Sequence, residues 1–191
     1  EEIVETSVAV ARSAAAAACG RTPVIVGSIG PTGDRGLDEA RLAWAYRQVA
    51  AALLRAGVCA LHLETCFDPS ELRVALAAVR SVASELPLLV SVTVTHGQLG
   101  RETPLGVPLE RLLRELADDP PAMIGVNCSQ NADRMRGAVA ALAKWANNAG
   151  RRLPVLARPQ LHSGAPDCKR PAKDVPPDQF AQQLLRLLDE S

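Results

Sequence analysis

The stretch VCALHLETCFDPSELRVALAAVRSVASELPLLVSVTVT, residues 58–95, decides the fold. It opens with an apolar run that ends at Glu64 and closes with a second apolar run that begins at Leu88. Both runs are nearly continuous in hydrophobicity, which is typical of parallel strands buried on both faces. Between them, Asp68-Pro69 introduces a segment with helical spacing of Leu and Val. This order of elements predicts a βαβ unit with two parallel strands.

Apolar runs of the same kind recur along the whole chain. Their starts follow one another about every 30 to 35 residues, a period that indicates a repeated strand–helix unit. The predicted strands are Pro23–Ser28, Val58–Glu64, Leu88–Thr95, Ala122–Cys128 and Pro154–Arg158. Parallel strands that alternate with helices form either an open doubly wound sheet or part of a closed barrel, and composition alone does not choose between them.

Helices are predicted before the first strand and after every strand. Their ranges are 2–19, 38–56, 68 onward, 108–117, 132–149 and 177–189. The helix that begins at Asp68 has an acidic N-cap, then Pro69 and Glu71 in its first turn. Gly57 is placed to end the preceding helix. No linker separates these elements, so residues 1–191 are expected to form a single domain.

The composition excludes several classes of function. Hydrophobic residues make up 48% of the chain but aromatic residues only 3%, so Ala, Leu and Val are expected to build the core. The 21 Lys and Arg balance the 21 Asp and Glu. Without a basic run, the sequence gives no support for binding to nucleic acid or to a membrane surface. No apolar run reaches the length of a transmembrane helix.

The cysteines indicate a reducing compartment. There are 5 of them, an odd number, and no C-x-x-C pair, so we do not expect a disulfide framework. The apolar stretch 8–19 is not interpreted as a signal peptide, because Glu1, Glu2 and Glu5 stand where positive charge is needed. We therefore expect a cytoplasmic protein.

Polar residues at the carboxyl ends of the predicted strands are the candidates for chemistry, because ligands of parallel α/β folds bind at that edge. They are Ser28, Glu64, Thr95, His96, Cys128 and Gln160. The Glu64 carboxylate is interpreted either as the acceptor for a substrate ammonium group or as part of a buried salt bridge. Cys128 is a small buried hydrophobe unless a metal or a substrate accompanies it.

Several other residues could have a functional role but are explained by structural roles. His62 lies within a strand and is interpreted as a packed residue, and Asp68 is fully explained as a helix cap. Cys19, Cys59 and Cys66 show no zinc spacing and are expected to be structural. Trp44, Tyr46 and Trp145 lie on predicted helix faces and are expected to pack. The glycine-rich turn 30–36 does not fit G-x-G-x-x-G and is interpreted as an ordinary turn.

Taken in order, the strand ends resemble the homocysteine S-methyltransferase family. Residues 26–33 (VGSIGPTG) are similar to the family's AGSIGPTG segment, and residues 63–68 (LETCFD) to its ETFFD segment. Residues 90–93 (VSVT) resemble its VSVTF strand, and residues 124–129 (IGVNCS) its IGxNCS motif. Residues 176–181 (PPDQFA) resemble the TPEEFA start of a late helix. The similarity extends over essentially the whole chain.

The resemblance implies an incomplete (β/α)8 TIM barrel made of about strands three to seven with their helices. It also implies transfer of a methyl group to the thiolate of homocysteine to give methionine. Cys128 corresponds to one of three zinc thiolates and Glu64 to the carboxylate that contacts the homocysteine amino group. Ser28, Asn127 and Gln160 are expected to complete the substrate site. The methyl donor is left open among S-methylmethionine, S-adenosylmethionine, betaine and methylcobalamin.

The chain also departs from the family's pattern. It contains no Cys-Cys pair, whereas the family takes its other two zinc cysteines from GGCC. The full zinc site therefore needs cysteines that this chain lacks, and the chain alone is expected to be inactive. Open barrel edges predict self-association. Two alternatives stay open: a non-catalytic remnant of the fold that acts as an interaction piece, and an unrelated α/β binding module.

Overall fold

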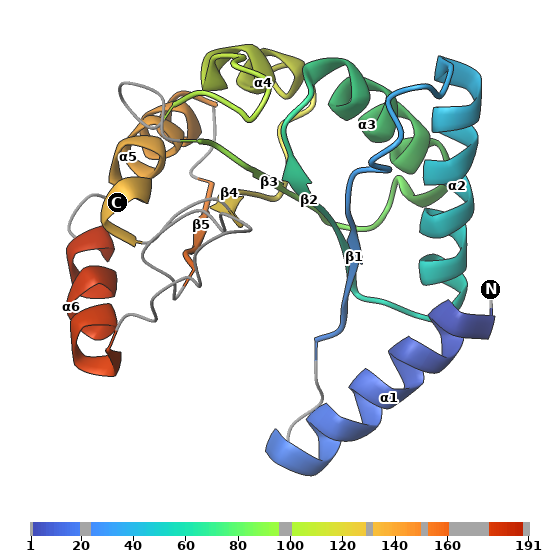
Figure 1. Ribbon diagram of the computed structural model, residues 1–191. Coiled ribbons are helices and arrows are strands. Elements are labelled where there is room, and N and C mark those ends of the chain that lie inside the picture. Colours follow the sequence, from blue (N-terminus) through green and yellow to red (C-terminus); the bar gives the residue numbers. More distant parts are fainter. Residues whose placement is uncertain are drawn as a thin grey trace, which may run out of the picture. The chain divides into compact units, whose positions relative to one another are not determined.

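In a computed structural model, the chain alternates helices and strands in the predicted order, which confirms the α/β class (Figure 1). The structure describes residues 2–19, 24–95, 101–128, 132–149, 153–160 and 176–188. The elements are α1 (Glu2–Cys19), β1 (Val26–Ile29), α2 (Glu39–Arg55), β2 (Ala60–Cys66), α3 (Pro69–Ala83), β3 (Leu88–Val92), α4 (Leu109–Glu115), β4 (Met123–Asn127), α5 (Ala132–Asn148), β5 (Val155–Arg158) and α6 (Pro177–Leu188). Among the described residues, no helix combines the length and the hydropathy that crossing a membrane requires.

The five strands form one sheet in the order β1-β2-β3-β4-β5. Strands β1 and β2 pair in parallel with Ser28 opposite His62, and β4 and β5 pair in parallel with Asn127 opposite Arg158. Sequential order with parallel pairing is what repeated right-handed strand–helix units produce. Strands β1 and β5 are therefore the two edge strands of this sheet.

The described chain divides into two compact units. The first comprises residues 1–64 and 70–89, and the second comprises residues 65–69 and 90–191. The boundary falls within β2, between Glu64 and Thr65, and within β3, between Leu89 and Val90.

In the first unit, capping residues fix both ends of α2. The carboxylate of Asp38 accepts a hydrogen bond from the backbone N–H of Arg41 at 2.8 Å, which satisfies one of the free donors of the first turn. At the other end Gly57 has a φ of 76°, the left-handed conformation that ends a helix and that glycine adopts without strain. The predicted role of Gly57 is confirmed. Arg12 of α1 donates to the carbonyl oxygen of Gly57 at 2.8 Å and so joins α1 to this turn.

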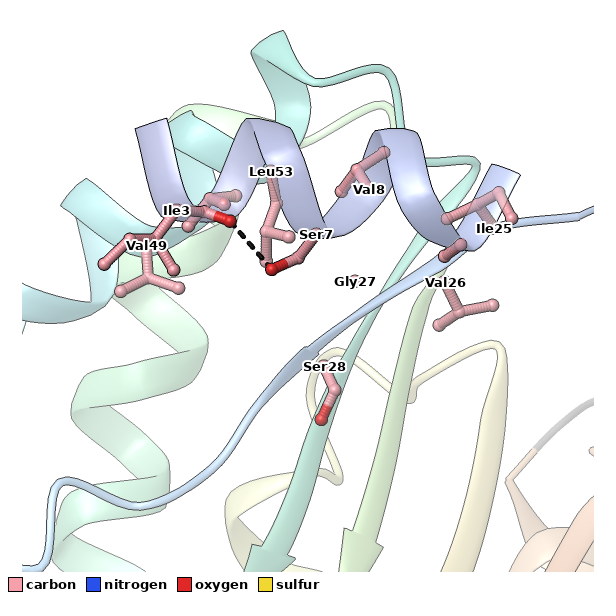
Figure 2. Close-up of a pocket in the computed structure, with 11 residues that line it drawn as sticks. Ile3, Ser7, Val8, Ile25, Val26, Gly27, Ser28, Val49 and Leu53 are labelled. Carbon is pink, nitrogen blue, oxygen red and sulfur yellow. Dashed lines mark hydrogen bonds between the residues drawn. The ribbon is translucent and has the colours of Figure 1, made fainter. Parts of the chain in front are cut away.

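The helix α2 lies against one face of β1. A Cβ atom at Gly27 would lie 2.9 Å from a methyl carbon of Leu53, so only glycine allows this approach. Because side chains alternate along a strand, Val26 and Ser28 lie on the opposite face. Figure 2 shows both side chains projecting from β1 away from α1.

An apolar groove lies between α1, β1 and α2 in the first unit (Figure 2). Its volume is about 300 Å³, and Ile3, Val8, Val49 and Leu53 are among the residues that line it. Val49 is 38% exposed because it borders this groove, although its helical spacing places it on the face of α2 that carries the buried Leu53.

The core of the second unit is built by leucine and β-branched side chains from α4, α5 and β4. Leu112, Leu116, Ile124 and Leu142 are fully buried, as their spacing predicts. Gly125 of β4 allows β5 to approach, since a Cβ atom there would lie 2.8 Å from Cβ of Leu156.

Two packing predictions were wrong. Trp44 is 61% exposed, because it lies on the side of α2 opposite the strand. Cys59, which was predicted inside the strand Val58–Glu64 as a structural residue, is exposed just before β2 begins at Ala60. Tyr46, in contrast, is buried as predicted.

Candidate functional site

The side-chain amide of Asn127 connects strand ends within the second unit. Its Oδ1 accepts hydrogen bonds from the backbone N–H of Thr65 at 3.1 Å and from the hydroxyl of Ser91 at 2.8 Å. Its Nδ2 donates to the hydroxyl of Thr65 at 2.9 Å. Asn127 is only 2% exposed, and a buried amide needs such partners to offset its loss of hydration. The amide thus determines where the end of β2 lies relative to β4.

Thr93 strengthens this arrangement from the end of β3. Its hydroxyl donates to the carbonyl oxygen of Asn127 at 2.6 Å, and its backbone N–H donates to the carbonyl oxygen of Cys66 at 2.9 Å. The carboxyl ends of β2, β3 and β4 are therefore held together by polar contacts, at the edge where parallel folds place their ligands.

The backbone is strained at two residues of this cluster. Thr65 has a φ of 63° and Cys128 a φ of 65°, both in the left-handed region. This conformation costs about 1–2 kcal/mol for a residue with a Cβ atom, and it is especially rare for a β-branched residue such as threonine. Such strain persists only where surrounding contacts hold it, and it concentrates at functional sites. The contacts from Asn127 to both the N–H and the hydroxyl of Thr65 are of this kind.

Cys128 follows β4 directly and has an exposed, free thiol. Its carbonyl oxygen accepts a hydrogen bond from Nε2 of Gln160 at 2.6 Å. The structure therefore brings together three of the predicted site residues: Asn127, Cys128 and Gln160. It also shows that the Gln160 amide is engaged with the backbone of Cys128.

Of the other predicted site residues, Ser28 and Glu64 lie in the first unit and Thr95 in the second, whereas His96 lies outside the described residues. Ser28 pairs in register with His62, and Glu64 follows two positions later, so all three occupy the sheet face opposite α2. His62 is 6% exposed, and its Nδ1 lies 3.7 Å from a carboxylate oxygen of Glu64, whose side chain is 27% exposed. The prediction that His62 is packed is confirmed, but it packs beside a carboxylate.

The glycine-rich turn after β1 has a structural partner. Oε1 of Glu71 in α3 accepts hydrogen bonds from the backbone N–H of Thr32 at 2.8 Å and from its hydroxyl at 2.9 Å. The hydroxyl of Tyr46 donates to the same oxygen at 2.9 Å. These contacts explain the turn as a docked loop, in agreement with its interpretation as an ordinary turn.

The sequence reasoning missed Thr65, Ser91 and Thr93. A signal was present, because Ser91 and Thr93 are polar residues at alternate positions of an otherwise apolar segment. Buried hydroxyls at such positions need partners. The pattern did not identify Asn127 as their hydrogen-bond partner, because Asn127 lies 36 residues from Ser91 and 62 residues from Thr65 in the sequence.

Across the described ranges, no group of three or more His, Cys, Asp or Glu side chains is arranged to hold a metal ion. A structural or catalytic zinc needs at least three protein ligands. Cys128 offers one exposed thiol. The described residues do not, by themselves, fit a zinc site.

Comparison with known proteins identifies the architecture. The model of the family described as Homocysteine S-methyltransferase matches residues 1–191. The apo form of the homocysteine methyltransferase MmuM from Escherichia coli is similar with a TM-score of 0.63 and 21% sequence identity, over 97% of this chain and 73% of that one. Its oxidized form gives a TM-score of 0.62 and 20% identity, over 97% of this chain and 70% of that one. The likeness confirms the predicted fold, an incomplete (β/α)8 TIM barrel.

Replacing Asn127 with alanine is expected to destabilise the protein by about 2–4 kcal/mol, because it leaves the buried Ser91 hydroxyl and the Thr65 N–H without an acceptor. Urea unfolding followed by circular dichroism measures this change. The matched control is Gln160→Ala, which removes one hydrogen bond to a backbone carbonyl from a partly exposed side chain and should cost about 1 kcal/mol or less. Equal, small effects for both substitutions would show that Asn127 does not hold the strand ends.

Proposed function

The chain belongs to the homocysteine S-methyltransferase family. From this premise we propose that it forms part of an enzyme that transfers a methyl group to the sulfur of homocysteine and so produces methionine. The observation that carries the proposal is the family match over residues 1–191 together with the polar cluster at the carboxyl ends of β2, β3 and β4. In the reaction the homocysteine thiolate attacks the methyl carbon, and the bond from that carbon to the donor atom breaks with its electron pair leaving on the donor.

We assign the recognition of the substrate's amino group to Glu64. A half-buried carboxylate binds an ammonium group more strongly than an exposed one does, because less water screens the interaction. His62, at 3.7 Å, restricts the orientations open to this carboxylate. Ser28 lies on the same sheet face and offers its exposed hydroxyl to the polar end of the substrate.

Asn127 and Gln160 support the site in a different way. The Asn127 amide is already hydrogen-bonded to Thr65 and Ser91, so its contribution to substrate binding is to hold the peptide that follows Glu64. Gln160 holds the carbonyl group of Cys128 and thereby the direction of the thiol. Both are proposed as positioning residues whose effect reaches the substrate through Glu64 and Cys128.

Cys128 is proposed as one zinc ligand of the complete enzyme. Zinc, when bound, would hold the homocysteine sulfur as a thiolate at neutral pH. No further ligands for such a metal are grouped with Cys128 among the described residues. A free, exposed thiol at Cys128 also fits a reducing compartment, and we propose the cytoplasm.

The test of the function is methionine formation by the protein as its gene encodes it. Purified protein is incubated with homocysteine and, in separate reactions, with S-methylmethionine, S-adenosylmethionine, betaine or methylcobalamin, and methionine is measured by mass spectrometry. We expect one donor to support turnover, and Glu64→Gln to lower kcat/KM for homocysteine by about 10- to 100-fold, the equivalent of one charge-assisted hydrogen bond. Glu85→Gln, at an exposed position, is the matched control and should leave the rate unchanged. No turnover with any of the four donors would contradict the proposed function.

The 191-residue chain alone is expected to retain much less than one equivalent of zinc after dialysis, because one thiolate cannot complete a tetrahedral site. Elemental analysis of the dialysed chain measures the metal content, and Cys128→Ala should leave that content unchanged. One tightly bound zinc per chain that is lost in Cys128→Ala would overturn this expectation.

We also propose that the 191-residue chain self-associates through the edge strand β1. Edge strands present unpaired backbone groups, and Val26 on β1 is 40% exposed. Sedimentation velocity should show association that increases with protein concentration. Val26→Lys should shift the distribution toward monomer, because a charged edge residue opposes strand pairing. Val10→Lys, at an exposed position of α1, should not. A monomer at every concentration would contradict the proposal.

A further inference from the structure

A second groove, in the second unit, has no part in the proposed methyl transfer. It lies between α4 and α5, and its volume is about 610 Å³, within the range of about 300–1,000 Å³ that is usual for small-molecule sites. Its apolar lining comes from Leu113 of α4, from Ala117 just after α4, and from Ala140 and Ala141 of α5. All of its lining residues belong to the second unit, so the groove is formed within one compact body.

The charge around this groove is unbalanced. Arg101, Arg114 and Lys144 line it, and Glu110 is the one acidic residue of the lining. Glu110 lies 3.9 Å from Arg101, whereas Arg114 and Lys144 are exposed and have no ion pair among the residues that the structure describes. The lining therefore has a formal excess of two positive charges, in a chain whose overall net charge is +0.

Arg101 contributes a third basic side chain to the lining of this groove. Its Nε is buried, and no described group accepts a hydrogen bond from it. A buried donor without an acceptor is costly, and native structures rarely retain one without a reason. Because the Nε is itself buried, a ligand in the groove would meet the outer part of this side chain, which is 41% exposed.

Trp145 determines what kind of anion fits. The indole is half-buried and lines the groove, and Ala141, one helical turn earlier, is too small to cover it. Indole rings in such positions bind flat aromatic groups and contribute a large contact area at low entropic cost. We propose that the groove between α4 and α5 binds a flat aromatic anion, with its ring at Trp145 and its negative charge between Arg114 and Lys144. This proposed site is independent of the proposed homocysteine site, so a negative result for one proposal does not affect the other.

The fluorescence of Trp145 tests the proposal directly. The chain has two tryptophans, and Trp44 is exposed in the first unit, so Trp44→Phe leaves Trp145 as the single reporter. AMP is the first probe and 1-naphthyl phosphate the second. We expect saturable quenching by at least one of them at low salt, weakened by added salt. Adenosine, which has a ring without charge, and inorganic phosphate, which has charge without a ring, should each bind at least about tenfold more weakly.

Charge-removing variants in the Trp44→Phe background complete the experiment. Arg114→Gln and Lys144→Gln should each weaken the binding of the aromatic phosphate by about tenfold, the loss of one charge-assisted contact. Arg73→Gln removes the same charge from an exposed position of α3 and should leave binding unchanged. Circular dichroism checks that each variant is folded. Absence of saturable quenching by both probes, or equal affinity in Arg114→Gln, Lys144→Gln and Arg73→Gln, would overturn the proposal.

Discussion

The organisation of the second unit depends on one buried amide. Asn127 is the point where the ends of β2, β3 and β4 are joined, and it holds Thr65 in a conformation that a threonine does not adopt unaided. An amide can do this because it both accepts and donates, so it engages the N–H and the hydroxyl of the same residue. Aspartate would lose the donor, and leucine of similar size would leave buried polar groups without partners. The strain at the strand ends and the polar cluster are thus two aspects of one arrangement.

The sequence predicted the elements well because the signals for them are local. The apolar runs and the Gly57 helix stop depend on residues that lie close together in the sequence, and both appear in the structure. Strand limits shifted by a few residues, as for β1, which was predicted as Pro23–Ser28 and begins at Val26. The end of a strand depends on pairing with its neighbour, and a linear pattern does not contain that pairing.

The candidate site could be predicted only in part, for a related reason. The position of Cys128 and Glu64 at strand ends follows from periodicity, and their assignment to zinc and to the amino group follows from family motifs. The hydrogen-bond partners of Asn127 could not be predicted from periodicity or from motifs, because they lie on two other strands and their contacts do not depend on sequence spacing. The exposure of Trp44 was missed because helical spacing gives the faces of a helix but not the one that is covered. Glu64 and Cys128 lie in separate units, and their approach to a common substrate stays a prediction.

The polar residues at the strand ends are of two kinds. Some have side chains that are hydrogen-bonded within the protein, and others have reactive atoms that are accessible to a ligand. The Asn127 and Gln160 amides and the Thr93 hydroxyl are engaged with other parts of the protein. The Cys128 thiol is free and exposed, although its carbonyl group is fixed and its backbone is strained. A group that is held rigidly but left chemically unoccupied is suited to bind something that is not part of the fold, because its orientation has already been set at the expense of folding stability. The difference between a free and an engaged reactive group therefore distinguishes Cys128, the proposed zinc ligand, from Asn127 and Gln160, the proposed positioning residues.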